Sequence, residues 1–199
     1  MTKKIRTEPI NIAPDIIGWL DIHNTPKVFD KRNNVELDPT NLDDKIIIYE
    51  RQVSDWFLKP ASDLIRYKNK NKGFIVLMIC LSYIEGVEQY IQGVPSQRGG
   101  SRFFFVTSME RIYPNKFQPH ELEDFYSEAR CGLFHNGMVK ERIIINNRFS
   151  ESLEFVNTDI RVNPKKFLED ITNDFHNYLN NLQANNILRT NFNQMYTNI

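Results

Sequence analysis

An arginine and a histidine five residues apart, Arg130 and His135, stand at the predicted end of a helix in the middle of the chain. Near neutral pH an imidazole can move protons, and a guanidinium can hold a phosphate and offset the charge that grows during its cleavage. Asn136 could orient a phosphate or a base through hydrogen bonds. These residues suit phosphodiester cleavage in RNA, where the 2′-hydroxyl can serve as the nucleophile and no metal ion or other cofactor is demanded.

The geometry of a helix limits how these side chains could cooperate. Successive residues of an α-helix are rotated by about 100°, so Arg130 and His135 diverge by about 140° on one straight helix. They can converge only if the helix unwinds at its end or if two such helices meet. Joint action therefore requires a distorted helix end or a dimer.

Two other interpretations of this segment remain open. In the first, His135 to Gly137 is only a helix C-cap, in which Gly137 supplies the left-handed residue and Arg130 pairs with a carboxylate. In the second, Cys131 and His135 form a nucleophile and a base one turn apart. Acidic residues on the same face would disfavour the thiolate that this second interpretation needs.

The composition is typical of a globular protein, and its balanced charges produce no overall electrostatic attraction for nucleic acid. Among the 199 residues, 25 Lys and Arg balance 25 Asp and Glu, so any contact with RNA must be local. The longest apolar run, residues 74–81, is far shorter than the roughly 20 residues that cross a bilayer, and we expect no membrane segment. Two cysteines and no visible secretory signal favour a reducing cytoplasm.

Local clusters of cations are the candidates for contact with an RNA backbone. They gather in a loop after the first predicted helix and around a second, glycine-containing loop. A solvated turn is the competing interpretation for such clusters. The candidates are Arg66, Lys68, Lys70, Lys72, Arg98 and Arg102.

Five helices are predicted from the spacing of apolar residues and from the prolines and glycines that bound them. They cover about 43–67 with a kink at Pro60, 74–92, 102–113, 119–135 and 164–184. The helix at 74–92 is apolar on every side in its first half, so we expect it to be the buried central element. Residues 186–199 are expected to form a C-terminal tail.

A polar face follows in the second half of the 74–92 helix. It could be a polar wall beside the Arg130 segment, but charged stripes on helices usually face water. We therefore expect a solvated edge. The face consists of Ser82, Glu85, Glu88, Gln89 and Gln92.

The remaining segments are less regular. Residues 1–40 contain four prolines among many Asn and Asp residues, which favours an extended N-terminal arm. The helical domain is expected at 41–185, with a β-hairpin at about 139–162. Within that hairpin, β-rich runs at 142–145 and 152–156 flank a polar turn. The predicted fold class is mainly α.

The order of these elements and the segment Ser127-Glu-Ala-Arg-Cys-Gly-Leu-Phe-His-Asn-Gly137 resemble the HEPN superfamily, the higher eukaryotes and prokaryotes nucleotide-binding domains. Members of this superfamily are bundles of four to five helices. Their penultimate helix ends in a motif of an arginine and a histidine separated by four to six residues. Arg130 and His135 match this motif. The resemblance covers residues 44–184 if the β-hairpin is counted as an insertion before the last long helix.

This resemblance implies a metal-independent endoribonuclease in a toxin–antitoxin or phage-defence role. It further implies a homodimer, in which two Arg130/His135 pairs face each other in a composite cleft, with RNA as substrate and an antitoxin or another protein as a partner. The chain departs from the family at Cys131, where a polar residue such as Asn or Asp commonly follows the arginine. The alternative is a catalytically inactive HEPN-like module that binds a protein partner or a nucleotide.

Overall fold

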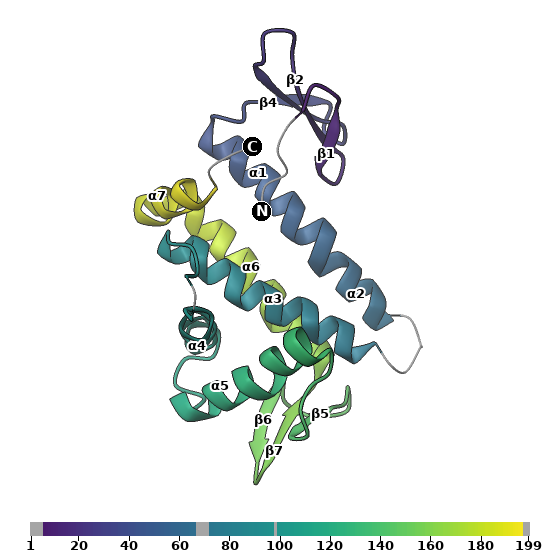
Figure 1. The fold of residues 1–199 in the computed structure, drawn as a ribbon, viewed down its shortest axis with the longest axis vertical. Helices are drawn as coiled ribbons and strands as arrows, with labels where there is room; N and C mark the ends of the chain where they lie inside the picture. Colours follow the sequence, from purple (N-terminus) through teal and green to yellow (C-terminus); the bar gives the residue numbers. More distant parts are fainter. Residues whose placement is uncertain (1–5, 67–71, 98, 197–199) are drawn as a thin grey trace.

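The protein is mainly α-helical and carries two small β-sheets, which lie at opposite ends of the helical body (Figure 1). The computed structural model describes residues 6–66, 72–97 and 99–196. The predicted mainly α fold class is confirmed.

The first long helical stretch changes its hydrogen-bond register near Pro60. It consists of α1 (Leu42–Val53), the π-helical turn η1 (Ser54–Leu58) and α2 (Lys59–Arg66). The Lys59 N–H donates to the carbonyl of Ser54, five residues earlier. Proline has no N–H, and its ring crowds the carbonyl four residues before it, so a widened turn accommodates Pro60. The predicted kink is this turn.

Helix α3 (Gly73–Gln92) is the central element, as predicted. It packs against α4 (Ser101–Ile112), α6 (Pro164–Ala184) and α7 (Asn186–Met195). It ends at Gly93, which has φ +72°, and a Cβ there would lie 2.9 Å from Asn191 of α7. With a mean hydropathy of 1.5, α3 is long and apolar enough to cross a membrane, a test that the core helix of a globular protein also passes.

The closing helices α6 and α7 complete the core. Asn163 caps α6 by accepting hydrogen bonds from the N–H groups of Lys165 and Lys166, as the predicted cap and first-turn proline indicate. Within the predicted C-terminal tail, where Phe192 could belong to a last helical turn or two, residues 186–195 form a longer helix, α7, whose Phe192 is fully buried. The ring of Phe192 lies 5.3 Å from that of Tyr49, so tertiary aromatic contacts stabilise a helix too short for a clear sequence period.

The predicted N-terminal arm is wrong, because residues 10–37 form an antiparallel sheet. The four prolines of residues 1–40 precede and follow β1, begin β3 and follow β4, positions at or beyond strand ends where proline is tolerated. Asn24 and Asn34 adopt positive φ in the tight turns between strands. The prolines therefore lie at or beyond the strand ends of a β-meander. Its strands pair in sequence order: β1 (Ile10–Ala13), β2 (Ile16–Leu20), β3 (Pro26–Asp30) and β4 (Val35–Leu37).

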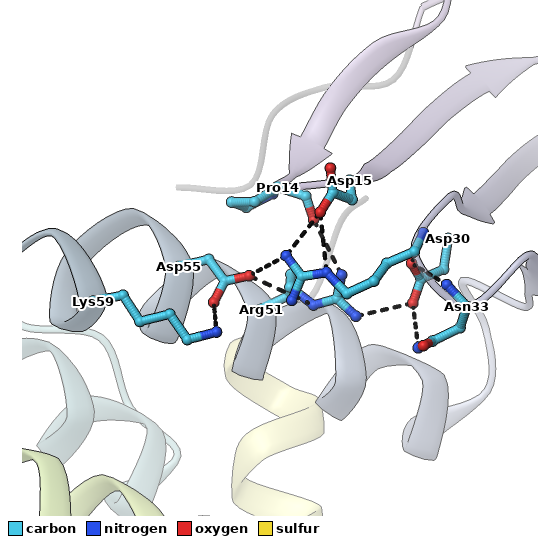
Figure 2. A network of polar contacts seen from close by, with 8 residues as sticks. Pro14, Asp15, Asp30, Asn33, Arg51, Asp55 and Lys59 are labelled. Carbon is cyan, nitrogen blue, oxygen red and sulfur yellow. Dashed lines mark hydrogen bonds and ion pairs between the residues drawn. The ribbon is translucent and has the colours of Figure 1, made fainter.

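A network of ion pairs joins this sheet to the helices (Figure 2). The Arg51 guanidinium of α1 lies 3.0 Å from the fully buried Asp30 carboxylate at the end of β3. Arg32 contacts both Asp15 and Asp55 at 2.7 Å. Since removing one partner of a buried pair leaves a charge unpaired, the position of the sheet depends on this network.

At the other end of the molecule, the predicted β-hairpin is wrong in its pairing. A third strand, β7 at residues 159–162, is central in place of the run at 152–156: β5 pairs in parallel with β7, and β6 forms a hairpin with β7. Asn157, with φ 56°, lies in the tight turn that closes β6 onto β7. The strands are β5 (Ile143–Ile145), β6 (Leu153–Val156) and β7 (Asp159–Val162).

We expect Asp30→Ala to lower the free energy of unfolding by up to about 3–5 kcal/mol, because it removes the nearer carboxylate of the buried Arg51, which keeps only Asp55 at 3.8 Å. Glu36→Ala is the matched control: Glu36 is mostly exposed, and its pair with Lys27 spans 3.4 Å, so the expected loss is below about 1 kcal/mol. Urea unfolding followed by circular dichroism measures both. Equal losses would contradict the role of the network.

Asp55 makes the stability depend on pH. Burial would raise its pKa, but hydrogen bonds from Lys59 and Arg32 outweigh this and hold the pKa below its ordinary value. A depressed carboxyl pKa stabilises the fold above the unfolded value of about 4, and that stabilisation is lost as the pH falls through the folded pKa. The difference in unfolding free energy between the parent and Asp55→Asn should thus shrink below about pH 4. A difference independent of pH would refute this.

Candidate functional site

The Arg130 segment lies in a helix that is α-helical at its start and π-helical over its remainder. The α5 helix (Pro119–Phe125) begins with a capping box between Gln118 and Glu121. It continues as η2 (Tyr126–Asn136), a π-helix of eleven residues. Gly137 then ends η2 with φ +73°, so the C-cap that the sequence predicts is confirmed.

The π-helical register of η2 reduces the angle between Arg130 and His135 around the helix axis. In a helix closed by i→i+5 hydrogen bonds, residues five apart stand one turn above each other, as residues four apart do in an α-helix. Tyr126 and Cys131 have the same spacing, and Cys131 is close enough to raise the pKa of Tyr126. Of the two conditions for joint action, the structure therefore meets the first, a distorted helix within one chain.

The segment that follows η2 folds back along it. The Lys140 N–H donates to the Glu128 carbonyl at 3.0 Å, and the Lys140 ammonium lies 3.0 Å from the Ser127 hydroxyl. Gly132 makes this approach possible, because a Cβ on it would lie 2.7 Å from the Met138 carbonyl oxygen. A side chain at position 132 is thus incompatible with the returning backbone.

Arg130 is held by a carboxylate of the central helix. Its Nε donates to Glu85 Oε2 at 2.9 Å, and one terminal nitrogen lies 2.8 Å from the same oxygen. The two side chains are only 17% and 15% exposed. Among the described residues the other terminal nitrogen, Nη1, makes no hydrogen bond. The carboxylate partner expected by the C-cap interpretation is therefore Glu85.

Most of the polar face of α3 is a wall between helices, so its prediction as a solvated edge holds only for Ser82, which is exposed. Glu88 is 2% exposed and lies 3.2 Å from Arg111 of α4. Gln92 donates to Glu88, while the Gln89 side chain accepts from the Ser96 N–H. Arginines on neighbouring helices neutralise these carboxylates, and the sequence of α3 by itself does not reveal them.

Two aromatic rings flank the Arg130 guanidinium. Its central carbon lies 5.6 Å from the ring centre of Tyr126 and 5.1 Å from that of Phe134, distances at which cation–π attraction is effective. Arg102 of α4 lies 5.8 Å from the Tyr126 ring. Burial raises the pKa of Tyr126, and Arg130 opposes that shift. Each ring stands four residues from Arg130 in the sequence.

Some of the other residues that the sequence predicts for the site lie close to Arg130, and others lie elsewhere in the structure. His135 and Asn136 are exposed at the end of η2. Of the candidate RNA-binding cations, Arg102 joins the site, whereas Arg66 lines a groove of about 700 Å³ between α2 and α6 to which η2 contributes nothing. Lys72 precedes α3. Lys68, Lys70 and Arg98 lie outside the described residues.

Comparison of the chain with known protein families, curated proteins and solved structures finds no match. What the site can do therefore has to follow from its own geometry. That geometry offers a fixed guanidinium with one nitrogen available to an anion and an exposed imidazole on the same side of the helix. Among the described residues no three His, Cys, Asp or Glu side chains gather as ligands of a metal ion would.

We expect Gly132→Ala to lower the free energy of unfolding by about 1–3 kcal/mol, because the new methyl group overlaps the backbone of the returning segment. Gly86→Ala is the matched control within α3: no atom lies within 4 Å of its added Cβ, so stability should rise by up to about 1 kcal/mol. Thermal unfolding compares the two. If both substitutions stabilise the protein, the close approach at Gly132 does not exist.

Proposed function

We propose that this chain is a metal-independent endoribonuclease of the HEPN type. In this proposal Arg130 holds the scissile phosphate, His135 transfers protons at the same phosphodiester, and Asn136 assists in positioning it. The observation that carries the proposal is the π-helical register of η2, which places residues five apart on one side of the helix. The helical body around α3 agrees with the bundle of the family that the sequence resembles.

Glu85 acts on the reaction through Arg130. It occupies Nε and one terminal nitrogen, which leaves Nη1 to donate to a phosphate oxygen. The rings of Tyr126 and Phe134 restrict where the guanidinium can lie. A cation fixed before the substrate arrives stabilises the growing negative charge without having to reorganise. Glu85 is thus a positioning residue.

His135 supplies proton transfer. The 2′-hydroxyl oxygen attacks phosphorus and forms a new P–O bond, while the bond from phosphorus to the 5′-oxygen breaks. Either the imidazole accepts the proton of the 2′-hydroxyl while water protonates the departing 5′-oxygen, or the protonated imidazole donates to the 5′-oxygen while water takes the proton of the 2′-hydroxyl. The products are a 2′,3′-cyclic phosphate and a 5′-hydroxyl. His135 is exposed at the end of η2, where a substrate can reach it.

A homodimer in the cytoplasm, and a role in a toxin–antitoxin or phage-defence system, remain predictions that belong to this proposal. The register of η2 removes one reason for the dimer, because Arg130 and His135 already share a side of one helix. A second copy would then bring two complete pairs together, rather than complete one pair.

The second candidate is a catalytically silent HEPN-like module that binds a protein partner or a nucleotide. The ion pair between Arg130 and Glu85 favours it, since an arginine already paired at 2.8 Å can serve the fold alone. Cys131, which directly follows the arginine, agrees with this candidate as well.

Cleavage of RNA in EDTA separates the two candidates. We expect the parent to cut RNA, and Arg130→Ala and His135→Ala each to lower the rate by about 100-fold or more, because each removes a group that acts on the phosphodiester. The matched control is His176→Ala, which removes an exposed histidine from α6 and should leave the rate unchanged. A parent that binds a protein partner tightly but cuts no RNA would establish the silent module.

Glu85→Gln tests the positioning of Arg130 in the same assay. The neutral amide retains the shape but weakens the ion pair, so we expect kcat to fall by about tenfold while the fold is kept. Circular dichroism confirms the fold. An unchanged kcat would show that Glu85 does not position Arg130.

A further inference from the structure

Cations and aromatic rings alternate through the proposed active site. Arg102 of α4 lies 5.8 Å from the ring of Tyr126, and Arg130 lies 5.6 Å from the same ring. Arg130 in turn lies 5.1 Å from the ring of Phe134. Cation–π attraction holds such a series together. Arg102, Tyr126, Arg130 and Phe134 are called the aromatic–arginine series below.

The series ends on an exposed ring. Phe134 is 44% exposed, whereas Tyr126 at its other contact with Arg130 is 9% exposed. His135 directly follows Phe134 in the chain. An apolar ring open to solvent therefore lies against the guanidinium that is proposed to hold the scissile phosphate.

A nucleobase is the part of an RNA substrate that fits such a ring. Bases stack on aromatic side chains irrespective of their sequence, because every base has a flat π face. In an A-form duplex both faces of a base are covered by its neighbours, while an unpaired base can turn out and present one. A ring next to the reacting phosphate therefore favours unpaired nucleotides.

We propose that Phe134 is the stacking platform for the unpaired base adjacent to the scissile phosphate, and that it makes the site select single-stranded RNA over duplex RNA. This inference rests on the proposed endoribonuclease function. Arg130 orders the ring from one direction, and the base stacks on the part of the ring that is open to solvent. Phe134 thus determines specificity without taking part in proton transfer.

Steady-state cleavage of one RNA oligonucleotide, single-stranded or annealed to its complement, tests the platform. Phe134→Ala should raise KM for the single strand about 5- to 100-fold, the range expected from the loss of one stacked base. Phe134→Trp should retain the parent KM, because the larger ring still stacks. Phe57→Ala is the matched control, since Phe57 is 43% exposed on η1 and should leave KM unchanged.

An oligonucleotide with an abasic residue at the cleavage position completes the test. The parent should cut it with the raised KM of Phe134→Ala, and Phe134→Ala should not distinguish it from the normal strand. If the parent cuts RNA but Phe134→Ala retains its KM, the platform is refuted while the proposed function stands. If the parent cuts no RNA, both the stacking platform and the proposed function are refuted.

Sedimentation of Phe134→Ala must match that of the parent. Loss of a dimer in this variant would show that Phe134 contacts a second copy of the chain instead.

Discussion

The i→i+5 register of η2 is the constraint on which the site depends. In an α-helical register Arg130 and His135 would diverge by about 140°, and a single chain could not aim both at one phosphate. The π-helix greatly reduces that divergence. Gly132 and the Lys140 hydrogen bond hold the following segment against the helix, so the register forms part of a packed unit.

The central helix serves both the core and the site. Its apolar residues, such as Val76 and Leu77, are fully buried, and its carboxylates Glu85 and Glu88 bind arginines of η2 and α4. Arg111 also pairs with Asp174 of α6, so three helices share one group of charges. Buried charges need such partners because their desolvation is costly. The pairing fixes η2 against α3 and places Arg130.

Sequence reasoning recovered the elements whose signals are local. The α6 helix follows from its Asn163 cap and regular apolar stripe, and the end of η2 follows from Gly137. It failed where distant contacts decide. The N-terminal sheet depends on strand pairing around prolines, and α7 depends on aromatic packing by Phe192. The π-helical register of η2 has no local sequence signal either. The segment that packs against Gly132 comes from beyond the end of the helix, so this contact is not visible in the helix sequence.

Arg130 and His135 of the same chain are proposed to act on one phosphate. Mixing Arg130→Ala chains with His135→Ala chains, under conditions in which subunits exchange, tests this most directly. No chain in the mixture carries both residues, so the RNA cleavage rate should stay at the level of the separate variants. Recovery of cleavage on mixing would show that Arg130 of one chain works with His135 of another, and would contradict the account.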